Sequence, residues 1–136
     1  MTAFTPITTP LSLKSRIITV LGDLLGTYTY PNKYTEPAIS IGGRPAEGLK
    51  VSGIEARLPR SPFILRSYWV GNYLHQDRYY DVIFIQHSGN KLYDCVDKLT
   101  RHFPYTNGVE IPDYDAVKNL PQYRVSIYCP DAFEAL

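Results

Sequence analysis

The stretch that decides the fold lies between residues 81 and 99 and reads DVIFIQHSGNKLYDCVDKL. Residues 82–85, VIFI, are continuously apolar, which is typical of a buried strand. A polar break, HSGN, follows at residues 87–90. Beyond it the helical spacing of the apolar residues predicts a helix that ends before Pro104 and buries Leu92, Cys95, Val96, Leu99 and Phe103. The chain therefore passes from strand to helix at a short junction.

The junction places Ser88 beside His87, which raises the question of nucleophilic catalysis. A nucleophile elbow has glycines on both sides of its serine, and only Gly89 is present here. Neighbours on an extended strand also point to opposite faces, so His87 is badly placed to act as the base. Ser88 or Asn90 as the helix cap explains the same residues. We therefore predict no catalytic residue and no enzymatic activity.

Outward from this stretch, the N-terminal half begins with a second amphipathic pattern. Residues 10–25 are predicted to form a helix, with Thr9 as its cap, Pro10 in its first turn and Gly26 at its end. Residues 1–10, rich in Thr and Pro, are expected to be a flexible or partner-docked segment. A short strand is predicted at Ala38–Ile41.

The middle of the chain predicts further strands. Residues 49–58 alternate with a slip at Ser52-Gly53, which indicates a β-bulge, and Pro59 and Pro62 end that strand. Residues 63–74 and 78–87 are predicted to pair as an antiparallel hairpin that turns at HQD, residues 75–77. A half-buried strand with alternating apolar residues follows at 122–129, QYRVSIYC.

These elements predict an α+β fold: an antiparallel sheet of about four strands with a long central hairpin and two main helices packed on one face. Residues 1–136 are expected to form a single domain, because 136 residues match the usual size of one domain.

Composition narrows the classes of function. Apolar residues make up 44% and charged residues 20%, as in a globular protein, and a net charge of +1 gives no overall attraction to nucleic acid or anionic membrane. No apolar run reaches about 18 residues and no signal-peptide pattern opens the chain. We expect no membrane contact, and two reduced cysteines in a cytoplasm-like compartment.

Cofactor and metal motifs are not found. The histidines and the two cysteines lack zinc-ligand spacing, and GGRPAEG at residues 42–48 lacks the Gly-Lys-Ser/Thr ending of a phosphate loop. Asp113, Asp115 and Lys118 resemble the metal-binding residues of some nucleases, but the second acidic residue beside a lysine on a following strand is missing. These residues are interpreted as a turn, and we predict no metal and no cofactor.

Arginine and aromatic residues alternate in the middle of the chain. This composition suits single-stranded nucleic acid, and it equally suits the core of a protein–protein contact. The low net charge favours the second interpretation. The candidate subunit or partner contacts are Arg44, Arg57, Arg60, Phe63, Arg66, Tyr68, Trp69, Tyr73 and Tyr79.

From LSLKSRIITVLGDLLG (residues 11–26) to YRVSIYCPD (residues 123–131), the element order and the long hairpin resemble the tail terminator, or tail completion, proteins of long-tailed bacteriophages. The resemblance implies a structural virion protein that assembles in the bacterial host cytoplasm. It implies a hexameric ring that caps the tail tube, joins it to the neck connector proteins of the head, and meets DNA only as cargo. A head–tail connector or stopper protein, or a small nucleic-acid-binding domain, is the alternative.

Overall fold

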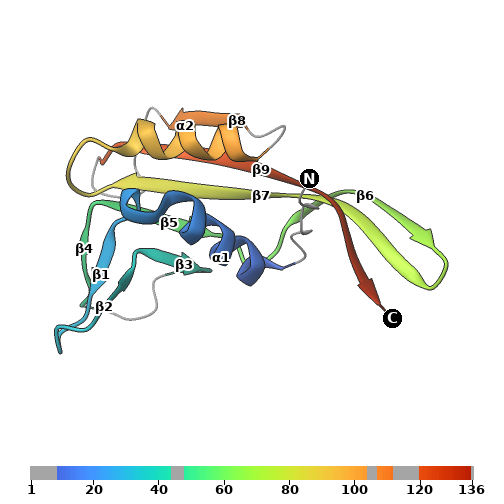
Figure 1. Cartoon of the computed structure of the whole chain (residues 1–136), viewed down its shortest axis with the longest axis horizontal. Coiled ribbons are helices and arrows are strands. Elements are labelled where there is room, and N and C mark those ends of the chain that lie inside the picture. Colours follow the sequence, from blue (N-terminus) through green and yellow to red (C-terminus); the bar gives the residue numbers. More distant parts are fainter. Residues whose placement is uncertain (1–8, 44–47, 104–106, 112–119, 136) are drawn as a thin grey trace.

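The computed structural model describes residues 9–43, 48–103, 107–111 and 120–135. The chain forms an α+β structure in which two helices lie against a long twisted sheet (Figure 1). Arg44 and the acidic cluster at residues 113–118 lie outside the described residues. Among the helices within the described ranges, none is long and apolar enough to cross a membrane.

The described residues form two sheets. The main sheet has six strands in the order β3-β5-β7-β9-β8, with β6 paired to β7, and a smaller sheet has the order β2-β1-β4. The strands of the main sheet are β3 (Ile39–Ile41), β5 (Ile54–Leu58), β6 (Phe63–Val70), β7 (Tyr73–Gln86), β8 (Asn107–Ile111) and β9 (Gln122–Ala135). The strands of the smaller sheet are β1 (Thr27–Thr29), β2 (Thr35–Pro37) and β4 (Lys50–Ser52).

The predicted four-stranded antiparallel sheet is therefore wrong in its strand count and in one pairing. β3 and β5 run parallel, with Ile39 opposite Ala56, and the other pairs are antiparallel. The physical reason is the excursion of the chain between β3 and β5 into the smaller sheet, where β4 pairs with β1. After that excursion the chain re-enters the main sheet in the direction in which it left.

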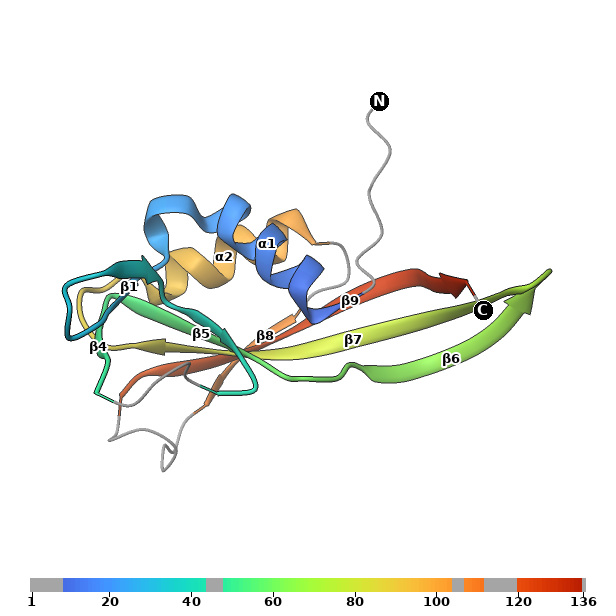
Figure 2. The same cartoon turned by 90° about the horizontal axis from the view of Figure 1, so that it is seen from below.

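Both main helices pack on one face of the main sheet, as predicted (Figure 2). They are α1 (Pro10–Leu21) and α2 (Leu92–His102). Their apolar faces are buried against alternate residues of β7 and β9, and this removal of apolar surface from water is the main contribution to the stability of the fold. The core includes Leu13, Ile17, Leu21, Tyr80, Val82, Phe84, Cys95, Leu99, Val125 and Ile127.

The N-terminal helix starts as predicted and ends earlier than predicted. Thr9 Oγ1 accepts a hydrogen bond from the Ser12 amide at 3.1 Å, so Thr9 caps α1 and Pro10 occupies its first turn. The α-helix stops at Leu21 because Gly22 adopts a positive φ of 52°, and a short 3-10 turn, η1 (Gly22–Leu24), continues to one residue short of the predicted end at Leu25.

Gly53 and Gly26 make the crossing between the two sheets, at the position where a bulge was predicted. Gly53 has φ of +75° and separates β4 from β5, so the slip in the alternation is a change of sheet. Gly26 lies against this crossing so closely that a Cβ atom there would come within 2.0 Å of the Ser52 carbonyl oxygen. Both positions therefore require glycine.

The predicted hairpin is present, but its turn lies elsewhere. β6 and β7 are joined at Gly71-Asn72, where Gly71 has φ of +62°. The residues expected to turn, 75–77, lie inside β7, opposite Tyr68, Ser67 and Arg66 of β6. Their polar side chains are accommodated in a strand because each has a polar or aromatic partner across the hairpin.

The second helix begins without the predicted cap. Lys91 is the N-cap of α2 and makes no side-chain capping bond, while Gln86 Oε1 accepts a hydrogen bond from the Leu92 amide at 3.1 Å. The Ser88 hydroxyl instead accepts a hydrogen bond from the Gly53 amide at 2.7 Å. The predicted buried stripe of α2 is confirmed. The hydrogen bond of Ser88 therefore links the strand–helix junction to Gly53, where the chain passes from one sheet to the other.

Candidate subunit-contact surface

A three-stranded extension projects beyond the helix-covered part of the main sheet at one end of the molecule (Figures 1 and 2). It consists of the β6–β7 hairpin, residues 63–79, here called the arm, with the C-terminal part of β9 paired alongside β7. β7 has fourteen residues, about 45 Å at the usual rise per residue, so it serves both the core and the arm. The arm therefore rests on a strand that is anchored in the hydrophobic core.

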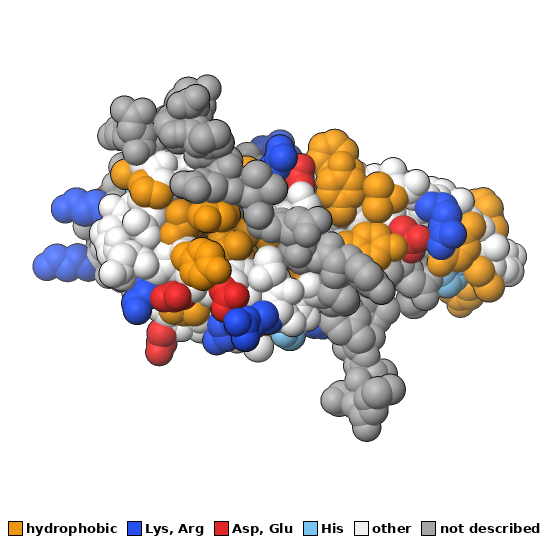
Figure 3. Space-filling model, turned by 90° about the horizontal axis from the view of Figure 1, so that it is seen from above, with side chains coloured by type: hydrophobic (Ala, Val, Ile, Leu, Met, Phe, Trp, Pro, Cys, Tyr) orange, Lys and Arg blue, Asp and Glu red, His pale blue; other side chains and the backbone are white. Residues whose placement is uncertain are grey.

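The arm carries much of the exposed apolar surface. Of the nine large hydrophobic residues exposed in the described part of the chain, six lie on it: Phe63, Ile64, Leu65, Trp69, Val70 and Tyr73. Their exposed fractions run from 47% to 59%. Figure 3 shows hydrophobic side chains gathered on this projecting end, with acidic and basic groups between them. The six residues are spread over both faces of the hairpin, and exposed apolar surface on this scale often marks contact with a partner.

Cross-strand contacts order one face of the arm. Arg66 Nη2 lies 2.9 Å from Asp77 Oδ2, and its guanidinium also lies 4.9 Å from the Tyr68 ring centre. The Tyr68 ring stacks on His75 at 5.4 Å between centroids. Because each of these contacts joins β6 to β7 or lies along β6, the face is held in place before any partner arrives.

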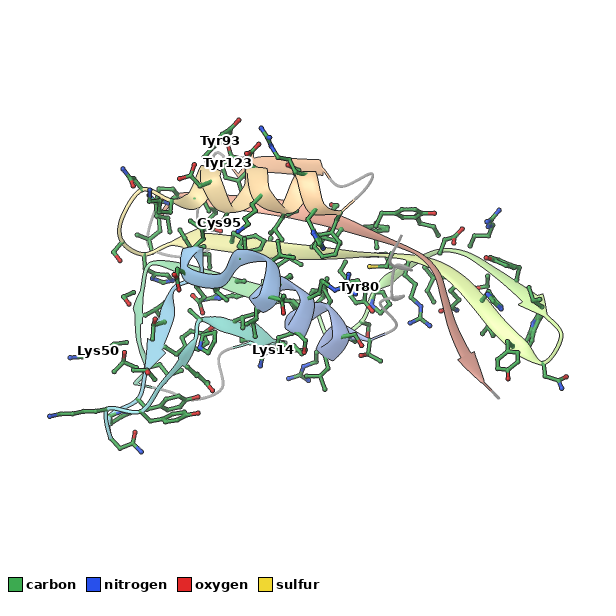
Figure 4. The ribbon with its side chains drawn as sticks, viewed as in Figure 1. Lys14, Lys50, Tyr80, Tyr93, Cys95 and Tyr123 are labelled. Atoms are coloured by element: carbon green, nitrogen blue, oxygen red, sulfur yellow. The ribbon has the colours of Figure 1, made fainter. Side chains whose placement is uncertain are left out.

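The base of the arm is stiffened by buried polar residues. Arg78 Nε donates to Gln76 Oε1 at 2.7 Å, and Gln76 Nε2 donates to Ser67 Oγ at 3.2 Å. Gln76, Asp77 and Arg78 are all less than 10% exposed. Tyr80, wholly buried, follows them where the arm joins the core (Figure 4). Buried, paired polar groups fix one geometry, so the arm leaves the core in a defined direction.

A hollow of about 560 Å³ lies at the base of the arm. The described residues that line it are Leu65, Tyr79, Ser126 and Tyr128, and Ser126 Oγ donates to Asp81 at 2.6 Å. Tyr79 also stacks on Phe63 with centroids 4.9 Å apart. Phenol rings with a polar end suit a partly wet contact surface.

The structure brings most of the predicted contact residues together. Six of them, Phe63, Arg66, Tyr68, Trp69, Tyr73 and Tyr79, lie on the arm. Arg60 is exposed in the loop before β6, with its side chain against Gly42. Arg57 lies apart, on β5, with Nη2 3.3 Å from Glu55 Oε1. Arg44 lies outside the described residues.

A buried polar cluster escaped prediction. Glu55 is 0% exposed, and its carboxylate accepts a hydrogen bond from Tyr28 Oη at 2.6 Å. The other carboxylate oxygen lies 2.8 Å from His87 Nε2. Tyr28 belongs to β1 of the smaller sheet and Glu55 to β5, so the cluster fastens the two sheets together. No sequence motif joins residues separated by 27 and 32 positions, and the only signal was an acidic residue inside an apolar strand.

Both cysteines are buried. Burial raises the pKa of the Cys95 and Cys129 thiols to about 12, so both are protonated at neutral pH. Cys95 lies between α2 and the sheet (Figure 4). In the described residues, no group of three His, Cys, Asp or Glu side chains is arranged to hold a metal ion.

Comparisons with known proteins give no relative: no family model, no curated protein and no solved structure matches this chain.

Proposed function

We propose that this protein is a structural virion protein of a bacteriophage neck or tail, a terminator that forms a ring on the tail tube and joins it to the head. It assembles in the host cytoplasm, then resides in the virion, with neck connector and tail tube proteins as its partners. DNA passes through the ring as cargo. The proposal assigns the chain no catalytic role and no cofactor.

The observation that carries this proposal is the apolar arm. Trp69 and Leu65 are more than half exposed on a strand that leaves the core. Because these side chains are already partly buried, covering the rest against a neighbour contributes roughly 1–2 kcal/mol each, which favours association when several are covered. A surface of this kind supports an assembled state for the chain.

The open edge of β6 supports the same proposal. Among the described strands, β6 pairs with β7 alone, so its outer edge offers unpaired backbone groups. Exposed edges of this length invite strand pairing with another chain unless they are covered. In a ring, each subunit covers the arm of its neighbour. In an isolated monomer, the same edge promotes uncontrolled aggregation.

A ring follows when two different patches of the same chain meet around a closed axis. The resemblance to tail terminators implies six subunits. Residues 1–8 precede the Thr9 cap of α1 and lie outside the described residues. The prediction that residues 1–10 are flexible or partner-docked therefore falls almost entirely outside the described residues.

Light scattering coupled to size-exclusion chromatography tests the proposal. The purified full chain is expected to elute as a particle of about 93 kDa, six times the 15.5 kDa of one chain. Negative-stain images should show rings with a central hole, and these rings should cap tubes of polymerised tail tube protein. A species that stays at 15.5 kDa at every concentration contradicts ring assembly. Rings that bind heads and ignore tail tubes would instead favour a connector.

A further inference from the structure

We propose that the arm of one copy seats in an acidic groove at the opposite end of a second copy. This inference rests on the proposed function and names the receiving surface. The groove has a volume of about 410 Å³ and lies between the end of α1 and the β1–β2 hairpin. Its lining includes Ile18, Asp23, Leu25, Thr35, Glu36 and Pro37.

Charge complementarity favours this pairing. Asp23 and Glu36 are acidic, and no Lys or Arg is among the described lining residues of the groove. The arm presents Arg66, whose side chain is 69% exposed although it contacts Asp77. Arg60 is exposed just before the arm begins. An exposed guanidinium meeting a groove with two carboxylates directs the encounter and fixes its orientation.

The apolar parts of the two surfaces also match. The face of the arm with Arg66 carries Tyr68 and the 47%-exposed Tyr73 beside it. The groove offers Ile18, Leu25 and Pro37 next to its two acids. Aromatic residues and arginine placed against an apolar pocket make the dominant contacts in protein interfaces.

The positions of the two surfaces identify the occupant as another copy of this chain. The arm lies at one end of the longest axis of the molecule and the groove near the other end (Figure 1). Because the core separates them, an arm does not reach the groove of its own chain. Two different patches at opposite ends generate a head-to-tail contact, which closes into a ring when the rotation between copies allows it.

A charge-exchange experiment tests this contact. We expect Arg66→Asp alone and Asp23→Arg alone each to weaken self-association roughly tenfold or more, because each places like charges together. Mixing the two variants should restore assembly, since normal arms then meet normal grooves and exchanged arms meet exchanged grooves. A chain carrying both exchanges should assemble alone.

Matched controls separate the outcomes. Asp94→Arg, on the exposed face of α2, should neither weaken assembly nor rescue Arg66→Asp. Circular dichroism of each variant checks the fold, and Asp23→Asn provides a milder change if Asp23→Arg unfolds. A wild-type chain that never assembles overturns the proposed function together with this contact. A wild-type chain that assembles, with no effect of Asp23→Arg or Asp23→Asn and no rescue, overturns the groove alone.

Discussion

Arg66 and Asp77 face each other across the arm, with 2.9 Å between Nη2 and Oδ2. The Asp77 side chain is 11% exposed, while that of Arg66 is 69% exposed. The buried carboxylate therefore orients a guanidinium that still has donors directed to solvent. We therefore expect Arg66 to be the charged group of the arm that matters most for the proposed contact.

Reversing the charge of Arg60 and Arg66 together should weaken assembly and leave the monomer folded. Both side chains are exposed, so Glu at these positions alters association more than the core. Sedimentation velocity should show a shift toward monomer, while circular dichroism keeps the native spectrum and the melting temperature falls only through loss of the Arg66–Asp77 contact. Lys98→Glu on the exposed face of α2 is the matched control. Normal particles with both reversals would contradict the role of the arm.

The Glu55 cluster should be a major contributor to stability. Glu55→Ala leaves Tyr28 and His87 without their shared acceptor, and breaking a buried charged network costs about 3–5 kcal/mol. Tyr28→Phe removes a single hydrogen bond to that carboxylate and should cost about 1–3 kcal/mol. Urea unfolding measures both.

Tyr93→Phe is the control for this comparison, because Tyr93 is 67% exposed and a surface change is expected within about 0.5 kcal/mol. If Glu55→Ala costs no more than Tyr93→Phe, the cluster does not fasten the two sheets.

Much of the helical structure follows from local patterns. The Thr9 cap and the buried stripe of α2 depend on residues close in sequence, and both predictions are confirmed. The alternation of residues 123–129 likewise predicts part of β9. The hairpin turn was misplaced because HQD and Gly71-Asn72 are both turn-forming, and only the cross-strand partners of β6 decide between them.

Features that depend on residues far apart in the sequence could not be predicted from local patterns. The parallel pairing of β3 with β5 depends on where the chain goes between them, and the pattern of a three-residue strand carries no such information. The partners of Glu55 come from β1 and from the residue that follows β7. For the candidate contact surface, composition indicated the arm, because aromatic and arginine residues gather in one stretch of sequence. The groove, built from α1, η1 and β2, had no such signal.

Cys95 and Cys129 should resist thiol reagents in the folded protein. Burial raises their pKa from about 9 to about 12, so little thiolate is present at pH 8. Ellman's reagent should label neither cysteine until guanidinium unfolds the chain. Rapid labelling of the native protein would contradict their burial.

The raised pKa of the two thiols should also lower the stability of the folded protein at alkaline pH. The unfolded thiols lose protons near pH 9, while the folded ones retain theirs, so stability falls as pH rises from about 9 toward 12. Thermal melts at pH 8 and pH 10 should show this loss. A Cys95→Ala, Cys129→Ala chain is expected to be less stable overall and to show a shallower pH dependence.

Binding to single-stranded DNA should be weak at physiological salt. The net charge is +1, and the arm arginines are proposed to contact protein, so few phosphates would be neutralised. Fluorescence anisotropy with a labelled oligonucleotide, over a range of salt concentrations, measures this. Submicromolar binding with a steep salt dependence would favour a nucleic-acid-binding domain instead.

The most direct test of the central claim, that the arm is the subunit contact, uses the single tryptophan of the chain. Trp69 is 58% exposed on the face of the arm opposite to Arg66, so its fluorescence reports whether the subunit contact also covers that face. Emission and iodide quenching are recorded across a dilution series whose particle mass is followed by light scattering. We predict that emission moves to shorter wavelength and quenching falls as the mass rises from monomer to ring. A ring in which Trp69 emits and quenches as in the monomer would contradict the claim.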